Sequence, residues 1–261
     1  MLLRILVAVI LFVFLLPIVL IIPLSFTSVS YFQVPPPGYS LVWYEKVLQN
    51  PVWIQVFSRS LIIGVITALI SLVIGTMAAL AFTRLNFWGK NIFVPLMLSP
   101  MVVPTVIVAI GLYHFFSPFK LADTYTGMVL SNSVIAIPIV FTLVAASLKG
   151  VDRNLELAAM GLGSTPVGAF FKITVPLMKT GLFSGALFAF SIVFDEPIIS
   201  LFMSGAHTKT LPVKYWESLR TSIDPSIAVV STVLIFMTIA LFLVQGWITS
   251  SSEKRMIKKG D

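Results

Sequence analysis

Two neighbouring acidic residues, Asp195 and Glu196, lie in an otherwise uncharged apolar stretch from Thr180 to Met203. Ionised side chains are costly in such surroundings, so carboxylates at this depth usually serve a function or an ion pair. Pro197 follows directly, and the residue before a proline is biased away from helix. We therefore predict a break at Glu196, which leaves backbone carbonyls beside two carboxylates and favours a cation.

This acidic pair has two readings. The carboxylates could line the path of a cationic solute, or they could pair with Lys or Arg from a neighbouring helix or a second subunit. The residue types leave both readings open. The sequence has no His/Glu cluster that predicts a metal site and no nucleophile with a base at recognisable spacing, so a membrane-embedded enzyme is disfavoured.

A second segment with potential chemistry is polar and runs from Asp152 to Pro176. Its first part carries apolar residues at helical spacing, which predicts a short helix with one apolar face. These residues are Leu155, Ala158, Ala159 and Leu162. Gly163 should end this helix, because glycine readily adopts a positive φ angle.

A second short helix should follow Gly163. Ser164 or Thr165 can cap its start, and Pro166 suits its first turn. We expect Val175-Pro176 to end it. The result is two short helices with a fixed bend, which could be a docking surface or a hairpin lying on the membrane.

The elements that carry these residues are membrane helices. The 261-residue chain is 58% hydrophobic and 10% charged, with a mean hydropathy of +1.03, far from the composition of soluble proteins. Its uncharged stretches can each hold a helix of roughly 20 residues, the length that crosses a bilayer. We predict six spans in an all-α membrane protein, near residues 5–25, 59–83, 91–117, 127–148, 180–203 and 227–249.

The charges indicate an orientation rather than a nucleic-acid site, although the net charge is +7. With six spans and a cytoplasmic N-terminus, eleven of the seventeen basic residues fall on the cytoplasmic side, which is the side that basic residues favour. These are Arg4, Arg84, Lys90, Lys149, Arg153, Lys172, Lys179, Lys254, Arg255, Lys258 and Lys259. We therefore expect both termini in the cytoplasm, in a single domain of residues 1–261 with a core of about 59–249.

The polar segment contains a recognisable spacing: Ala158-Ala159, three residues, Gly163, nine residues, Ile173, one residue, and Val175-Pro176. It resembles the "EAA" loop of permease subunits of bacterial ATP-binding-cassette (ABC) importers. The resemblance implies that residues 149–178 form a cytoplasmic coupling loop between helices 4 and 5, which sits on an ATPase subunit.

One position departs from the family pattern. Leu157 stands where the family carries a glutamate, and the acid stands one residue earlier, at Glu156. On a helix this shift rotates the carboxylate by about 100°. The family role of that glutamate is therefore not transferred to Glu156, which could still reach a partner's basic residue or cap the bend.

The segment from Asp152 onward also resembles the polyamine (spermidine/putrescine) branch of these permeases, which implies a small cationic solute. The resemblance further implies cytoplasmic ATPase subunits that carry ATP and Mg, a second permease subunit in a heterodimer, an external solute-binding protein, and a place in the bacterial inner membrane. The chain itself is expected to bind no cofactor and to hydrolyse no ATP, because Gly89-Lys90 lacks the rest of a phosphate-binding loop. The alternatives are an importer permease for another small solute and an ion-driven secondary transporter.

Overall fold

The structure, a computed structural model, describes residues 2–221 and 223–257, with side chains described up to residue 246. Internal contacts divide the chain into two compact units. Unit 1 comprises Met1–Ser58 and Val213–Phe242, and unit 2 comprises Arg59–Pro212 and Leu243–Asp261. The single domain expected from the sequence stays a prediction. Of the basic residues assigned to the cytoplasmic side, Lys258 and Lys259 lie outside the described residues.

Unit 1 contains α1 (Leu2–Ser25), α2 (Val42–Gln49), the first turns of α3 (Pro51–Arg84), most of α12 (Leu211–Thr221) and the first part of α13 (Ser226–Ile257). The connection between α1 and α2 is irregular. An isolated bridge pairs Thr27 with Tyr39, and the indole Nε1 of Trp43 donates a hydrogen bond to the Val29 carbonyl at 3.1 Å.

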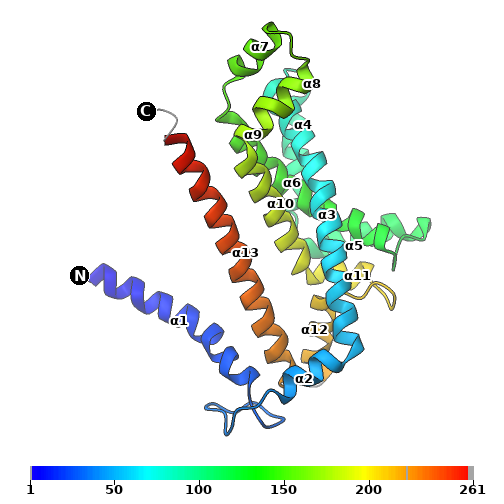
Figure 1. The fold of residues 1–261 in the computed structure, drawn as a ribbon. Helices are drawn as coiled ribbons and strands as arrows, with labels where there is room; N and C mark the ends of the chain where they lie inside the picture. The colour runs from blue at the N-terminus through cyan, green and yellow to red at the C-terminus, as the bar shows by residue number, and fades with distance from the viewer. Residues whose placement is uncertain (1, 222, 258–261) are drawn as a thin grey trace. The chain divides into compact units, whose positions relative to one another are not determined.

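Unit 2 holds the predicted coupling loop. It contains the rest of α3, α4 (Lys90–Leu98), η1 (Ser99–Met101), α5 (Thr105–Phe116), η2 (Ser117–Phe119) and α6 (Tyr125–Lys149). These are followed by α7 (Arg153–Gly161), α8 (Pro166–Ala169), the π-helix η3 (Phe170–Thr174), α9 (Val175–Leu177), α10 (Lys179–Phe194) and α11 (Pro197–Met203). Figure 1 shows α7 at one end of this unit, past the ends of α6 and α10.

Helix α6 is the central helix of unit 2, because 67% of its most apolar 18-residue stretch is buried within the structure. Helix α10 packs along it, and α11 lies against α5 and α6. Helices α10 and α6 approach closely at Gly181 of α10, where an added methyl group would lie 2.3 Å from the Ser147 Cβ of α6. Val140, Val144 and Leu148 of α6 are buried in this core. The start of α10, which follows the polar loop directly, is therefore held against the centre of the unit.

Among the described residues, four helices are long and apolar enough to span a membrane: Leu3–Ser25, Pro51–Arg84, Tyr125–Lys149 and Ser226–Gly246. Two further pairs of helices qualify only as bent spans. Lys90–Met101 and Thr105–Phe119 meet at 102°, and Pro166–Leu177 and Lys179–Phe194 meet at 75°. The first of these bends lies just before Pro104, the residue that precedes α5.

Two predicted spans need correction. Helix α3 begins at Pro51 rather than at residue 59, because Asn50 accepts a hydrogen bond from the Val52 N–H at 2.9 Å and proline suits the first turn of a helix. The predicted span 91–117 is not one helix. Within the predicted span 180–203 the expected break is present, because Asp195 and Glu196 separate α10 from α11.

Candidate functional site

Helix α7 has the boundaries that its end residues dictate. Asp152 precedes it in an extended conformation, and its Oδ1 accepts a hydrogen bond from the Asn154 N–H at 2.9 Å. At the other end Gly163 has a φ angle of +90°, which confirms its predicted role. The Gly163 and Ser164 N–H groups then donate to the carbonyls of Met160 and Ala159 at 3.0 Å. This arrangement satisfies backbone groups that the helix end would leave unpaired.

The second helix also begins as predicted. Thr165 caps it, since its Oγ1 accepts a hydrogen bond from the Gly168 N–H at 3.0 Å, and Pro166 occupies the first turn. The predicted end at Val175-Pro176 is wrong. After α8 the chain forms the π-helix η3, whose turns are wider, and it stays helical through Pro176 to Leu177. Pro176 is the second residue of α9, directly after this π-helix.

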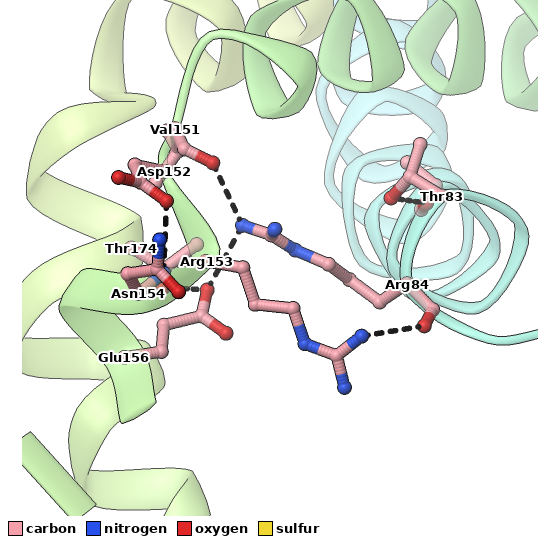
Figure 2. A network of polar contacts seen from close by, with 9 residues as sticks. Thr83, Arg84, Val151, Asp152, Arg153, Asn154, Glu156 and Thr174 are labelled. Carbon is pink, nitrogen blue, oxygen red and sulfur yellow. Dashed lines mark hydrogen bonds and ion pairs between the residues drawn. The ribbon is translucent and has the colours of Figure 1, made fainter. Parts of the chain in front are cut away.

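Glu156 lies at the centre of a polar network that joins three segments (Figure 2). Arg84, the last residue of α3, approaches it with Nη2 at 3.2 Å from the Glu156 Oε1. The hydroxyl of Thr174, in η3, donates a hydrogen bond to the same oxygen. The Glu156 side chain is 19% exposed and that of Arg84 17%, so the pair is partly shielded from water.

Two further contacts connect Arg84 to the start of the loop. Its Nη2 also donates to the Val151 carbonyl at 3.2 Å. In return, the Arg153 Nη1 donates to the Arg84 carbonyl at 3.5 Å, a long and exposed hydrogen bond. The last turn of α3 and the first turn of α7 are thus linked through both side chains and backbone (Figure 2).

Several apolar side chains in and next to α7 are exposed. Leu157, at the position where the family glutamate was expected, is 49% exposed, and Leu162 is 90% exposed. Leu155 and Ala158 are exposed as well, whereas Ala159 is half-buried. The predicted apolar face therefore exists, and among the described residues it is not buried by the chain's own core. The remaining predicted loop residues differ, since Ile173 is half-buried and Pro176 is exposed.

Sequence reasoning missed Arg84 and Thr174 as members of this site. Arg84 was counted only as a cytoplasmic charge, and it lies 72 positions before Glu156. Thr174 lies 18 positions after Glu156 in a π-helix, outside any helical repeat that includes the acid. A charged residue that directly ends an apolar span is the single local signal that pointed to Arg84.

The two acids of the predicted solute path, Asp195 and Glu196, have different surroundings in the structure. Helix α10 ends at Phe194 and α11 begins at Pro197, so the predicted break at Glu196 is confirmed. Glu196 caps α11, because its Oε1 accepts hydrogen bonds from the N–H groups of Ile198 at 2.7 Å and Ile199 at 3.1 Å. The Asp195 side chain is exposed and, within the described part of the chain, makes no hydrogen bond or ion pair.

A further acidic residue, Asp123, organises the loop after α11. Its Oδ1 accepts hydrogen bonds from the Gly205 N–H at 2.9 Å and from the N–H and hydroxyl of Thr208 at 3.0 and 2.8 Å. The His207 N–H also donates to this carboxylate, and the Asp123 N–H donates to the Met203 carbonyl at 2.8 Å. Burial raises the pKa of Asp123, but these hydrogen bonds outweigh it, so the net pKa is lowered. No local pattern in the sequence predicts this cluster.

Comparison with known proteins identifies the family. Residues 71–258 match the family described as binding-protein-dependent transport system inner membrane component. The spermidine/putrescine transport system permease protein PotC of Haemophilus influenzae is 27% identical over 237 residues, which cover 91% of this chain and 92% of that protein. The putrescine transport system permease protein PotI of Escherichia coli K12 is 29% identical over 249 residues, covering 93% and 88%.

A solved structure shares the fold. In a bacterial ABC transporter involved in the import of the acidic polysaccharide alginate, one chain superposes with a TM-score of 0.71 at 14% identity, covering 96% of this chain and 94% of that one. At this identity the likeness establishes the fold alone. The family match, however, extends over more than half of the sequence. This chain therefore belongs to the binding-protein-dependent transport system inner membrane components, the permease subunits of ABC importers.

Proposed function

We propose that this permease moves a small cationic solute of the polyamine class across the bacterial inner membrane. The observation that carries the proposal is Asp195, an exposed carboxylate without a partner among the described residues, placed where an apolar helix breaks. An unpaired acid in such a position is costly unless a cation meets it. The names of the relatives, spermidine/putrescine and putrescine permeases, support the same class of solute.

The proposed topology has six spans, with each bent pair of helices counted as one, and both termini in the cytoplasm. Four helices reach spanning length unaided, and the two bent pairs complete the six. This arrangement places residues 149–178 on the cytoplasmic side. The excess of Lys and Arg on that side supports it.

The exposed apolar face of α7 is the proposed docking site for a cytoplasmic ATPase subunit. Leu155 and Leu162 are exposed there, and an apolar patch on a polar loop is typical of an interaction surface. ATP and Mg belong to the ATPase subunits in this scheme. A second permease subunit, in a heterodimer, and an external solute-binding protein complete the transporter. A structure of the alginate transporter contains a periplasmic protein that binds an alginate pentasaccharide, which supports the last partner by analogy.

Reconstitution tests this function. The tagged chain is purified in detergent from its native membrane with its bound subunits, and the complex is placed in proteoliposomes with the external binding protein. We expect an ATPase and a second permease to co-purify, and labelled putrescine or spermidine to enter only with ATP. ATP-dependent uptake of an uncharged solute without uptake of either polyamine would overturn the solute class. Uptake by this chain alone, driven by an ion gradient, would instead support a secondary transporter.

A further inference from the structure

We propose that Glu156 is a positioning residue that fastens α7 to the end of α3 and to η3, the part of the coupling loop that leads into α10, so that α7, the end of α3 and the start of α10 move as one body. The inference rests on the proposed function in that α7 is taken as the element an ATPase subunit moves. It assigns Glu156 an internal role rather than a contact with that subunit.

The first anchor is Arg84 at the end of α3. Its Nη2 lies 3.2 Å from the Glu156 Oε1 and donates to the Val151 carbonyl at the same distance. Two acceptors from the loop therefore meet one terminal nitrogen of a membrane helix. Because both side chains are less than one-fifth exposed, water screens this pair less than it screens an ion pair on an open surface.

The second anchor is Thr174 in the π-helix η3. Its side chain is fully buried, and its hydroxyl donates to the same Glu156 Oε1 that meets Arg84. π-Helical turns are uncommon and often occur at functional positions. After Thr174 the chain passes through α9, bends by 75° and enters α10, which packs along α6. One carboxylate oxygen thus joins α7 both to the end of α3 and to η3, the segment that leads into α10.

An alternative role, in which Glu156 reaches out to the ATPase subunit, would dismantle this arrangement. Withdrawing Oε1 would leave the Thr174 hydroxyl buried without its acceptor. It would also leave the Arg84 guanidinium with the Val151 carbonyl alone, since the buried Arg84 Nε already has no acceptor among the described residues. Leaving such groups unpaired is unfavourable. The exposed neighbour Leu157 faces outward instead.

The mechanical consequence concerns the conversion of ATPase movement into transport. A loop that pivots freely on its ends could follow the ATPase subunit without moving the membrane helices. A loop whose α7 is fixed to α3 and to η3 transmits its displacement to α3 and, through η3, to α10. Loss of the Glu156 contacts should therefore reduce the solute moved per ATP hydrolysed, while the docking surface of α7 remains.

The test uses the complete complex in proteoliposomes and four versions of this chain. Glu156→Gln and Arg84→Gln each remove one charge of the pair, and Arg84→Glu with Glu156→Arg restores opposite charges in reverse order. Lys179→Gln is the matched control, because Lys179 is an exposed base just beyond the loop with no partner among the described residues. Three quantities are measured: the ATPase subunit that co-purifies, the rate of ATP hydrolysis, and the uptake per ATP hydrolysed.

A distance measurement reports directly on the rigid body. The chain has no cysteine, so Leu85→Cys and Asn154→Cys introduce a unique pair of spin-label sites in this chain, one at the exposed residue just past the end of α3 and one on α7. Copies with one label at a time identify signals from partner subunits. In the wild-type chain the distribution of distances between the two labels should be narrow and unchanged by ATP. In Glu156→Gln this distribution should broaden.

We expect both single variants to retain the ATPase subunit while their uptake per ATP falls by ~5-fold or more, the lower end of typical coupling between sites. The charge reversal should recover part of this loss, and Lys179→Gln should match the wild type. An unchanged uptake ratio in both single variants would overturn the proposal. So would loss of the ATPase subunit in Glu156→Gln but not in Arg84→Gln, which would make Glu156 a subunit contact. Failure of the proposed function would show differently, as absence of any ATPase subunit from the wild-type preparation.

Discussion

Arg84 and Glu156 are 72 positions apart in the sequence, yet the Arg84 Nη2 and the Glu156 Oε1 lie 3.2 Å apart. This contact explains the displaced acid of the loop. A shift from position 157 to position 156 rotates a side chain by about 100° around the helix. The rotation turns the carboxylate away from the side of α7 that carries the exposed Leu157, and toward α3 and η3.

The hydroxyl of Thr174 should contribute measurably to the stability of this network. Thr174→Val keeps the shape of the buried side chain but removes the hydrogen bond to Glu156. Because a hydrogen bond to a charged group contributes about 1.5–3 kcal/mol and Glu156 is partly exposed, we expect a loss near the lower end of that range. The thermal unfolding of the purified complex measures it. Thr174→Ser, which retains the hydroxyl, is the control, and equal melting temperatures for Val and wild type would contradict the prediction.

The two glycines at the end of α7 should respond to alanine in opposite ways. At Gly163 the φ angle of +90° makes any side chain unfavourable, by about 1–2 kcal/mol. Gly161 lies within the helix, and a methyl group there meets nothing within 4 Å. Gly161→Ala should therefore stabilise α7 slightly, since alanine favours helix over glycine. Hydrogen exchange of the α7 amides separates the cases: faster exchange in Gly161→Ala than in Gly163→Ala would refute this assignment.

Local chemistry was sufficient to predict the ends of several elements. Gly163 and Thr165 mark the end of one helix and the start of the next through backbone conformation and a side-chain cap, both of which depend on the residue itself. Pro197 marked the break at Glu196 in the same way. The start of α3 at Pro51 was missed even though Asn50-Pro51 is a local start signal, because the boundary was drawn from charge instead.

Contacts between distant residues could not be predicted from the sequence. The Arg84 guanidinium contacts Glu156 because α3 ends beside the first turn of α7, and no repeat in the sequence predicts this contact. The same holds for Asp123 and the 205–208 loop, which are more than 80 positions apart. The different roles of Asp195 and Glu196 depend on which of them precedes α11 closely enough to cap it.

The packing of α10 on α6 depends on a glycine. In Gly181→Ala the new methyl group would lie 2.3 Å from the Ser147 Cβ, so the two helices must separate. We expect a loss of about 1–3 kcal/mol, as for other overpacked cores. Gly185→Ala, one turn later, places its methyl group 3.5 Å from Val140 in ordinary contact and serves as the control. Melting temperatures in detergent test the pair, and an equal effect at both positions would contradict this view of the packing.

Asp123 should hold the loop after α11 over the whole physiological pH range. Its folded pKa lies below the ordinary value of 3.8, so its ionised form stabilises the folded loop. That contribution is fully present above pH 3.8 and is lost as the pH falls through the lowered folded pKa. A spin label at His207→Cys should therefore stay immobile from pH 8 to pH 5 and loosen only at more acidic pH. Asp123→Asn should loosen the label already at pH 7, and a wild-type label that is mobile at pH 5 would contradict the prediction.

Asp195 and Glu196 should differ when each is changed alone. Asp195→Asn removes a carboxylate that has no partner in the described structure, so the melting temperature should stay constant. The KM for polyamine uptake should rise about 10-fold or more, because a charge-assisted contact with the solute is lost. Glu196→Ala removes the cap of α11 and should cost about 0.5–2 kcal/mol of stability. Glu196→Gln keeps an acceptor oxygen and is the control for the cap. Unchanged uptake in Asp195→Asn would remove this residue from the solute path. A lowered melting temperature in the same variant would instead indicate an ion pair with the second permease subunit. An acid that contacts only the passing solute contributes no such pair to the stability of the solute-free complex, so its replacement should leave the melting temperature unchanged.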